Sequence, residues 1–363
     1  MARNADESSC PPGERGVESR GPGPDLPPPI PLLAMNGSLD RLPHDAAVRA
    51  AVELLCRGSP IIRTGSACDL SCVYCCVGAD GPPLQPEASL CRLVDGLARL
   101  GHRGIGYMGG EPAIHPAFER VVRHAKSRGF TCQMLCTNGI KLHDGDFAAR
   151  LFDAGINAVC TSLDAFDPKV QEPLYGGRAS LSKALAGLHH ALAAPPVEVL
   201  VSAVITAQNA RLLPGYMEEV DKLQVRYQKP VGVMLCVLQK PAREGPEQRA
   251  LTLSMPEAAK LTVKALQRAC KVGVAAFTFG FPPCLLPGHE QHVAELYAAE
   301  WKVDIDSGTV ERSQLRDAAA YWSKCAICPH GLYCPGVLEQ YADAKVQSLV
   351  AAWEPVASEE ARP

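Results

Sequence analysis

The chain has 363 residues, a formal net charge of −3 and 47% hydrophobic residues, so it can bury a full core as one large domain or two smaller ones. It has no basic block, which argues against a nucleic-acid partner, and no apolar run of about eighteen residues, so we expect no membrane span. Sixteen cysteines without an export signal predict a reducing, cytoplasmic location and metal ligation rather than disulfides.

The N-terminal part of the chain divides into two predicted segments. Residues 1–42 are rich in proline and glycine with scattered charge, which predicts a disordered tail. Residues 43–58 carry apolar side chains at helical spacing, so we expect a helix that leads into the main domain.

From residue 59 to residue 255, short apolar runs alternate with longer amphipathic segments. We expect strands at residues 60–64, 104–107, 131–136, 158–163, 197–205 and 231–238. We expect helices at residues 87–100, 115–127, 144–154, 181–192 and 209–223. This alternation predicts right-handed β-α units and a parallel α/β sheet covered on both faces. Periodicity alone fits a barrel or a doubly wound sheet.

Three cysteines follow the first expected strand. Cys68, Cys72 and Cys75 stand in C-x3-C-x2-C spacing, with Tyr74 before the last. Three thiolates can hold three irons of a [4Fe–4S] cubane and leave the fourth iron open, whereas iron–sulfur clusters usually take four cysteines. The same spacing suits a zinc site or a structural thiol cluster.

The motif Gly109-Gly110-Glu111-Pro112 follows the second expected strand. Its glycines allow close approach of the backbone to a ligand, and the Glu111 carboxylate can pair with an ammonium group. Together with the cysteine loop, this motif resembles the radical S-adenosylmethionine (radical SAM) superfamily. The resemblance implies a partial (β/α)6 TIM-like barrel, a [4Fe–4S] cluster on three cysteines, and S-adenosylmethionine chelated at the open iron. It also implies reductive cleavage to a 5′-deoxyadenosyl radical that abstracts hydrogen from the substrate.

Polar groups at later strand ends are further candidates, because a barrel gathers its functional residues there. Ser162 and Asp164 are two residues apart and share a face; the resemblance implies contacts to ribose hydroxyls and the methionine carboxylate. It implies adenine contacts for Tyr74 and Leu238, and Asn138 is a further cofactor-binding candidate. The alternatives are solvated strand-end residues, ordinary core positions, and a plain turn around Asn138.

Four cysteines in the C-terminal third form a second set, in a domain expected over residues 256–345 before a terminal helix and tail at 346–363. Cys284 precedes a predicted hairpin, and Cys325, Cys328 and Cys334 follow it as C-x2-C-x5-C. Four thiolates could ligate a second [4Fe–4S] cluster or one zinc. The set resembles the SPASM and Twitch extensions of radical SAM enzymes. No cysteine stands four positions after Cys334, so one Twitch-like auxiliary cluster is expected.

The remaining cysteines are interpreted without a function. Four of them fall inside expected strands: Cys132, Cys136, Cys160 and Cys236. Buried thiols behave as small apolar side chains, so we expect these four in the core. Cys76 lies beside the first cysteine motif and has no assigned role.

The resemblance implies an oxidoreductase or maturase that takes single electrons from a flavodoxin or ferredoxin. Peptide or protein maturation is the first expectation, since SPASM and Twitch enzymes often crosslink or oxidise peptides. Leader recognition would need a separate protein, because residues 1–42 show no recognition domain. One alternative is a small-molecule cyclisation like that of the molybdenum-cofactor Twitch enzymes, whose Gly-Gly ending this chain lacks. Another is a non-catalytic zinc or iron–sulfur scaffold.

Overall fold

The computed structural model describes residues 60–77, 83–176, 180–240, 242, 245–296, 301–303, 310–312, 319–330 and 334–353. The predicted tail and lead-in helix at residues 1–58 lie outside these ranges, as do residues 354–363 of the predicted C-terminal tail. All described residues belong to one unit, residues 37–363. No helix among them is long and apolar enough to cross a membrane.

Seven strands form one parallel sheet in chain order. They are β1 (Ile61–Arg63), β2 (Gly104–Met108), β3 (Cys132–Thr137), β4 (Ala158–Ser162), β5 (Glu198–Ile205), β6 (Val231–Val237) and β7 (Ala276–Phe279). The first and last strands are the two edges, so the sheet is open, and the predicted α/β fold with a partial barrel is confirmed. The seventh strand is an addition to the six predicted. It was missed because it is only four residues long and lacks β-branched residues apart from Thr278.

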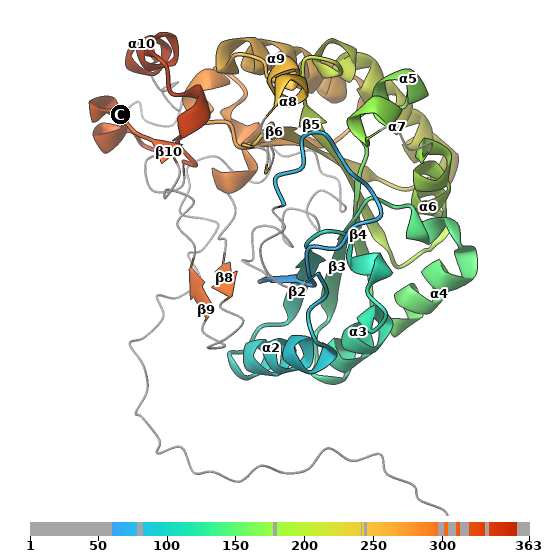
Figure 1. Ribbon diagram of the computed structural model, residues 1–363. Helices are drawn as coiled ribbons and strands as arrows, with labels where there is room; N and C mark the ends of the chain where they lie inside the picture. The colour runs from blue at the N-terminus through green and yellow to red at the C-terminus, as the bar shows by residue number, and fades with distance from the viewer. Residues whose placement is uncertain are drawn as a thin grey trace, which may run out of the picture. The chain divides into compact units, whose positions relative to one another are not determined.

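Helices lie along the outer side of the curved sheet (Figure 1). The longer ones are α2 (Glu87–Arg99), α3 (Phe118–Ser127), α4 (Gly145–Ala154), α6 (Leu181–Ala193), α7 (Leu213–Tyr227) and α9 (Met255–Val272), and the short ones are α5 (Pro168–Leu174) and α8 (Pro246–Leu251). In α2, the apolar residues Leu90, Leu93, Val94 and Leu97 recur at helical spacing and are all buried. The predicted helix positions therefore match the structure closely, apart from short 3₁₀ turns at their starts.

The two faces of the sheet differ in burial. Outer-face residues such as Leu135, Val159 and Val201 are at most 1% exposed and pack against the helices. The alternate residues form the inner face, which we define by Met134, Cys136, Cys160, Leu200, Ser202, Val204, Met234, Cys236 and Phe277. The cysteines expected in the core lie on this inner face and are half-buried. They pack against the apolar clusters of that face, so the expected core position is met in part. Strand alternation alone does not show which face of a strand meets the helices.

The C-terminal part forms two small antiparallel pairs. The predicted hairpin is present as β8 (Trp301–Val303) and β9 (Val310–Arg312), and β10 (Ala319–Ala320) pairs with β11 (Val337–Leu338). The predicted terminal helix is present as α10 (Ala344–Ala352) and begins two residues before the expected start at 346, whereas Val337 and Leu338 form β11. Both Tyr341 and Gln340 donate hydrogen bonds of 2.7 Å to the carbonyl oxygen of Leu238, just after β6.

Close packing between α6 and the loop after β3 gives a test of the fold. A Cβ atom at Gly187 would lie 2.2 Å from the carbonyl oxygen of Gly139. We expect Gly187→Ala to lower the free energy of unfolding by about 1–3 kcal/mol, because the backbone must shift. Gly96→Ala in α2 is the control, since the nearest atom would be 3.9 Å away; it should raise stability by about 0.5–1 kcal/mol. Equal effects in urea denaturation would contradict this packing.

Candidate active site

The first cysteine loop leaves β1 at the carboxyl edge of the sheet. Cys68 and Cys75 are exposed and Cys72 is half-buried; the amide of Cys75 donates to the carbonyl oxygen of Cys72 at 3.2 Å. Burial, then the nearby carboxylates and last the neighbouring thiols raise the pKa of Cys68 to about 11 and that of Cys72 further above its ordinary value. The structure therefore brings the three sulfur atoms within electrostatic reach of one another.

The predicted glycine motif packs directly against this loop. The amide of Gly110 donates to the carbonyl oxygen of Gly65 at 2.9 Å, and the amide of Glu111 donates to that of Ala67 at 2.8 Å. A Cβ atom on Gly110 would lie 2.1 Å from the oxygen of Ala67, and Gly109 has a φ of 142°. The structure thus supplies a reason for both glycines that does not involve a ligand: the two loops touch through their backbones.

Glu111 is 2% exposed and its carboxylate already has three donors. Its Oε1 accepts from the amide of Ala113 at 2.9 Å and from the hydroxyl of Thr137 at 2.7 Å, and its Oε2 accepts from the amide of Asn138 at 2.7 Å. Burial raises the pKa of Glu111 to about 7, although these hydrogen bonds oppose the shift. A carboxylate offers about four acceptor positions, so Oε2 has room for one more donor. Pro112 begins a buried 3₁₀ turn beside it.

Asn138 connects the end of β3 to the cysteine loop. Its Nδ2 donates to Asp69 at 2.7 Å and lies 3.9 Å from the Cys68 sulfur, while its Oδ1 accepts from the amide of Ile140 at 2.9 Å. The asparagine side chain therefore holds Asp69, next to the first cysteine. This segment is more than the plain turn that the sequence also allowed.

Asp164 connects the other side of the loop to β5. Its buried carboxylate accepts from the hydroxyl of Tyr74 and, at 2.8 Å, from the amide of Val204. Burial raises the pKa of Asp164 to about 6, against the opposite effect of these two hydrogen bonds. The carbonyl oxygen of Ser162 accepts a 2.6 Å hydrogen bond from the hydroxyl of Tyr175. Both oxygens of Asp164 thus have donors from the protein.

An apolar cluster lies behind the loop. Its buried members are Leu70, Leu174, Tyr175, Leu238 and Leu251, and Cys72 and Tyr74 pack against it. Leu238 is therefore near the cysteine loop, as expected, but it is 3% exposed. Its carbonyl oxygen also accepts hydrogen bonds from Gln340 and Tyr341, which link the C-terminal segment to the sheet.

Three residues that the sequence did not single out hold the end of β4. The Gln171 side-chain oxygen accepts from the amides of Asp164 and Ala165 at 2.8 and 2.7 Å. Asn209 donates to the carbonyl oxygen of Asp164 at 3.0 Å, and Tyr216 donates to that of Leu163 at 2.9 Å. Each lies in or next to a helix, where polar residues are ordinary, so no local signal could identify them.

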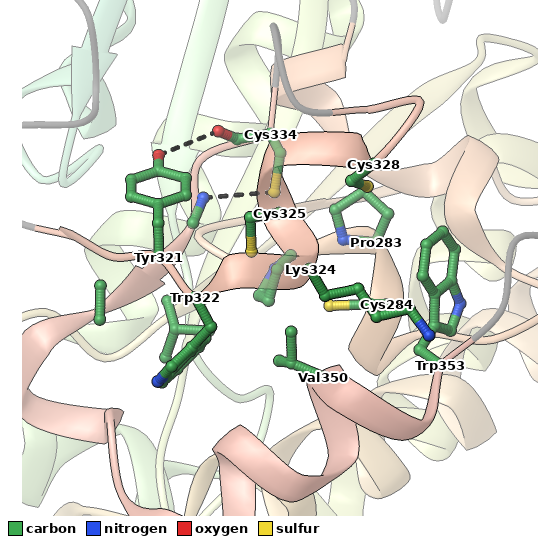
Figure 2. A pocket seen from close by; sticks show the side chains of 14 residues that line it. Pro283, Cys284, Tyr321, Trp322, Lys324, Cys325, Cys328, Cys334, Val350 and Trp353 are labelled. Atoms are coloured by element: carbon green, nitrogen blue, oxygen red, sulfur yellow. Dashed lines mark hydrogen bonds between the residues drawn. The ribbon is translucent and has the colours of Figure 1, made fainter.

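The four C-terminal cysteines line one pocket (Figure 2). Cys284 lies in a 3₁₀ turn after β7, Cys325 lies in another, and Cys328 and Cys334 follow. The amide of Gly336 donates to the Cys334 sulfur at 3.3 Å. Burial, and then the other cysteines of the set, raise the pKa of both Cys284 and Cys334 to about 12.

The donor sets fit iron–sulfur groups. All seven thiols are free, and thiolate sulfur is the usual ligand of iron–sulfur clusters. No group of three His, Cys, Asp or Glu side chains within the described ranges is gathered closely enough to hold a single metal ion. Because each cysteine of a cubane binds a different iron, cluster ligands stand farther apart than the ligands of one ion.

The Tyr74–Asp164 contact gives a direct test of how the loop is held. We expect Tyr74→Phe to lower the free energy of unfolding by about 1–3 kcal/mol, because it leaves the buried Asp164 carboxylate with one donor fewer. The added cost should vanish in an Asp164→Asn background, measured as a double-mutant cycle by urea denaturation. The control is Tyr227→Phe. It removes a 2.8 Å hydrogen bond between Tyr227 and His189, which lies away from the loop. Additive costs at Tyr74 and Asp164 would show that they are not coupled.

Comparison with known proteins finds a family model that matches part of the chain and a fold that extends over most of it. The profile described as the Radical SAM superfamily matches residues 62–219. A probable GTP 3′,8-cyclase of Methanopyrus kandleri is 31% identical over 159 residues, 43% of this chain and 50% of its own length. A GTP 3′,8-cyclase of Aeromonas hydrophila is 32% identical over 148 residues, 38% of this chain and 42% of its own. The chain thus spans half or less of the length of these curated relatives.

The fold is also found in solved structures. Streptococcus suis SuiB bound to the precursor peptide SuiA superposes with a TM-score of 0.55, over 80% of this chain and 74% of SuiB, at 13% identity. SuiB bound to S-adenosylmethionine gives a TM-score of 0.54, with coverage of 77% and 73%. At this identity the likeness concerns the fold alone.

Proposed function

We propose that this chain, in which residues 62–219 form a domain of the radical SAM superfamily, is a cytoplasmic enzyme that reductively cleaves S-adenosylmethionine. The observation that carries the proposal is the loop with Cys68, Cys72 and Cys75, fixed at the carboxyl edge of an open parallel sheet. That edge is where parallel α/β enzymes place their chemistry. Three cysteines leave one iron of a [4Fe–4S] cluster open to the cofactor.

The bound cluster supplies one electron that breaks a sulfur–carbon bond of S-adenosylmethionine and gives a 5′-deoxyadenosyl radical. The protein contributes ligation, orientation and exclusion of water. Glu111 has one acceptor position left at Oε2, which suits an ammonium group such as that of methionine. Asn138 and Asp164 hold the cysteine loop from its two sides.

The remaining cofactor contacts carry over from the sequence as part of the proposal. Ser162 lies at the end of β4 and is half-buried, so its hydroxyl can reach a ribose or carboxylate group. The Gly109–Gly110 backbone, Pro112, Tyr74 and Leu238 complete the expected site. Asp164 positions Tyr74 in this proposal, and each of its oxygens has one donor from the protein, which leaves acceptor positions for a ribose hydroxyl.

The C-terminal pocket is proposed to hold a second, auxiliary [4Fe–4S] cluster. Cys284, Cys325, Cys328 and Cys334 make a complete ligand set. The expected Twitch-like domain attaches to the sheet through Tyr341 and Gln340 at Leu238. Single electrons for the enzyme would come from a flavodoxin or ferredoxin.

We propose an uncharged peptide side chain as the substrate group. Every residue of β2 to β7 is described, and none of the inner-face positions on these strands is Lys or Arg. Triphosphates are usually bound by Arg, Lys or metal ions. On the seven strands of the sheet, the inner face carries one such side chain, Arg63, exposed at the end of β1, so this face suits a nucleotide triphosphate poorly. A separate protein that recognises the precursor is then an expected partner. The second candidate is a nucleotide cyclisation, because the sequence relatives are GTP 3′,8-cyclases.

Removal of the middle cysteine tests the catalytic loop. Cys72→Ala should abolish 5′-deoxyadenosine formation under dithionite, because a cluster with two cysteines has lost one of its three anchors. Cys270→Ala, at an exposed position on α9, is the control and should leave the yield unchanged. Full formation of 5′-deoxyadenosine by the Cys72 variant would show that this loop does not hold the catalytic cluster.

Removal of an auxiliary cysteine tests the second set. Cys328→Ala should lower the iron content after anaerobic reconstitution from about eight to about four per chain. Cleavage of S-adenosylmethionine without substrate should persist, because the catalytic loop is intact. Iron that stays at the wild-type level would show that these cysteines do not hold a cluster, and bound zinc would make the site structural.

The choice between substrate classes is tested with GTP itself. We expect no heat of binding when GTP is titrated into the reconstituted protein, and no change in the yield of 5′-deoxyadenosine. Micromolar binding or GTP-stimulated cleavage would replace the peptide proposal with the nucleotide one.

A further inference from the structure

Sulfur atoms gather on the inner face of the sheet, away from both proposed cluster sites. Cys136 of β3 and Cys160 of β4 are register partners in adjacent parallel strands, whose backbones run about 4.8 Å apart. Cys160 also packs with Leu200, Met234 and Cys236 on the far side. Cys136 and Cys160 are therefore adjacent. Cys236 lies beyond β5, on which Cys160 faces Leu200 and Cys236 faces Val204, so the three thiols form a row that is interrupted at β5.

The row is accessible from the inner side of the sheet. Cys136, Cys160 and Cys236 are half-buried, whereas Leu135 and Val159, on the outer face of the same strands, are at most 1% exposed. The helices cover the side chains on the outer face of the sheet, and these three thiols are on the other face. The exposed parts of these thiols consequently lie on the inner side of the sheet, opposite the helices.

The row also lies close to the first cysteine loop. Cys236 is the register partner of Val204, and Val204 packs in the apolar cluster with Cys72 and Tyr74. The thiols therefore line the sheet directly below the loop that we propose to hold the catalytic cluster.

Cys160 and Cys236 are poor nucleophiles in this setting. Contact with the Cys136 thiol and burial raise the pKa of Cys160 well above its ordinary value, and burial raises that of Cys236 to about 12. The thiolate is the form that attacks electrophiles and binds metals, so a thiol kept protonated does neither readily. It retains its S–H bond, which is weak enough to give a hydrogen atom to a carbon-centred radical.

We propose that the Cys136–Cys160 pair donates a hydrogen atom to carbon-centred radicals held over the inner face. The proposal rests on the proposed function, which supplies such radicals. In the step, the S–H bond of Cys160 breaks and a C–H bond forms on the radical carbon, which leaves a thiyl radical on Cys160. Cys136 can refill it by passing on its own hydrogen atom. One electron from the reduced electron-transfer protein and one proton from water then restore the thiol.

Deuterium gives the first test. Thiol hydrogens exchange with solvent and carbon-bound hydrogens do not, so S-adenosylmethionine cleaved in D₂O without substrate or added thiols should yield 5′-deoxyadenosine that carries deuterium. We expect Cys160→Ser with Cys136→Ser to abolish the deuterium, as read by mass spectrometry. Cys270→Ser removes an exposed thiol on α9 and should leave it unchanged. Undeuterated product from the wild type, or unchanged deuterium in the double variant, would overturn the proposal.

A second test uses the protein without cofactors, so it stands even if no S-adenosylmethionine is cleaved. The 2-hydroxy-2-propyl radical, made by radiolysis of aqueous 2-propanol, can take hydrogen atoms from accessible thiols, and a nitrone spin trap marks the resulting thiyl sites. We expect trap adducts on Cys136 or Cys160 in addition to the exposed Cys270. Labelling of the exposed thiols Cys68, Cys75, Cys76 or Cys270 without any adduct on Cys136 or Cys160 would contradict the proposed donor pair. If the inner-face thiols are labelled but the reconstituted protein forms no 5′-deoxyadenosine, the proposed function is contradicted. The ability of these thiols to donate hydrogen atoms is then still supported.

Discussion

The burial of two carboxylates, Glu111 and Asp164, is the constraint on which the first cysteine loop depends. A carboxylate removed from water costs several kcal/mol unless donors replace the lost hydration. Glu111 obtains its donors from its own turn and from the end of β3, and Asp164 obtains them from Tyr74 and from β5. Because these donors come from the loop, from the end of β3 and from β5, the carboxylates are satisfied only when all three segments reach their final positions together.

The local parts of this arrangement could be predicted from the sequence. Apolar runs predicted six of the strands within one or two residues, and the cysteine and glycine motifs located the loops at the strand ends. The partners were not predictable, because Gln171 and Asn209 meet Asp164 only after α5 and β5 have packed. The same holds for Asp164 itself: strand alternation placed it on a face with Ser162, but its neighbours Tyr74 and Val204 follow from tertiary packing.

Cysteine has three different environments in this fold, and the environment decides its chemistry. In the first loop, two of the three thiols are exposed, and a metal can displace their protons. In the C-terminal pocket, four thiols face one another among aromatic side chains (Figure 2). On the inner face, Cys136 and Cys160 lie side by side and pack against apolar neighbours. Spacing in the sequence identified the first two groups, whereas the third arises from strand register.

The central claim is that the first loop holds a cluster with one iron open to S-adenosylmethionine. The most direct measurement is the electron paramagnetic resonance spectrum of the reduced, reconstituted Cys328→Ala protein, in which only the catalytic cluster should remain, recorded with and without S-adenosylmethionine. We predict a [4Fe–4S]⁺ signal whose g-values shift when S-adenosylmethionine is added, because the cofactor becomes a ligand of the open iron. A cluster signal that is identical in both samples would contradict the account.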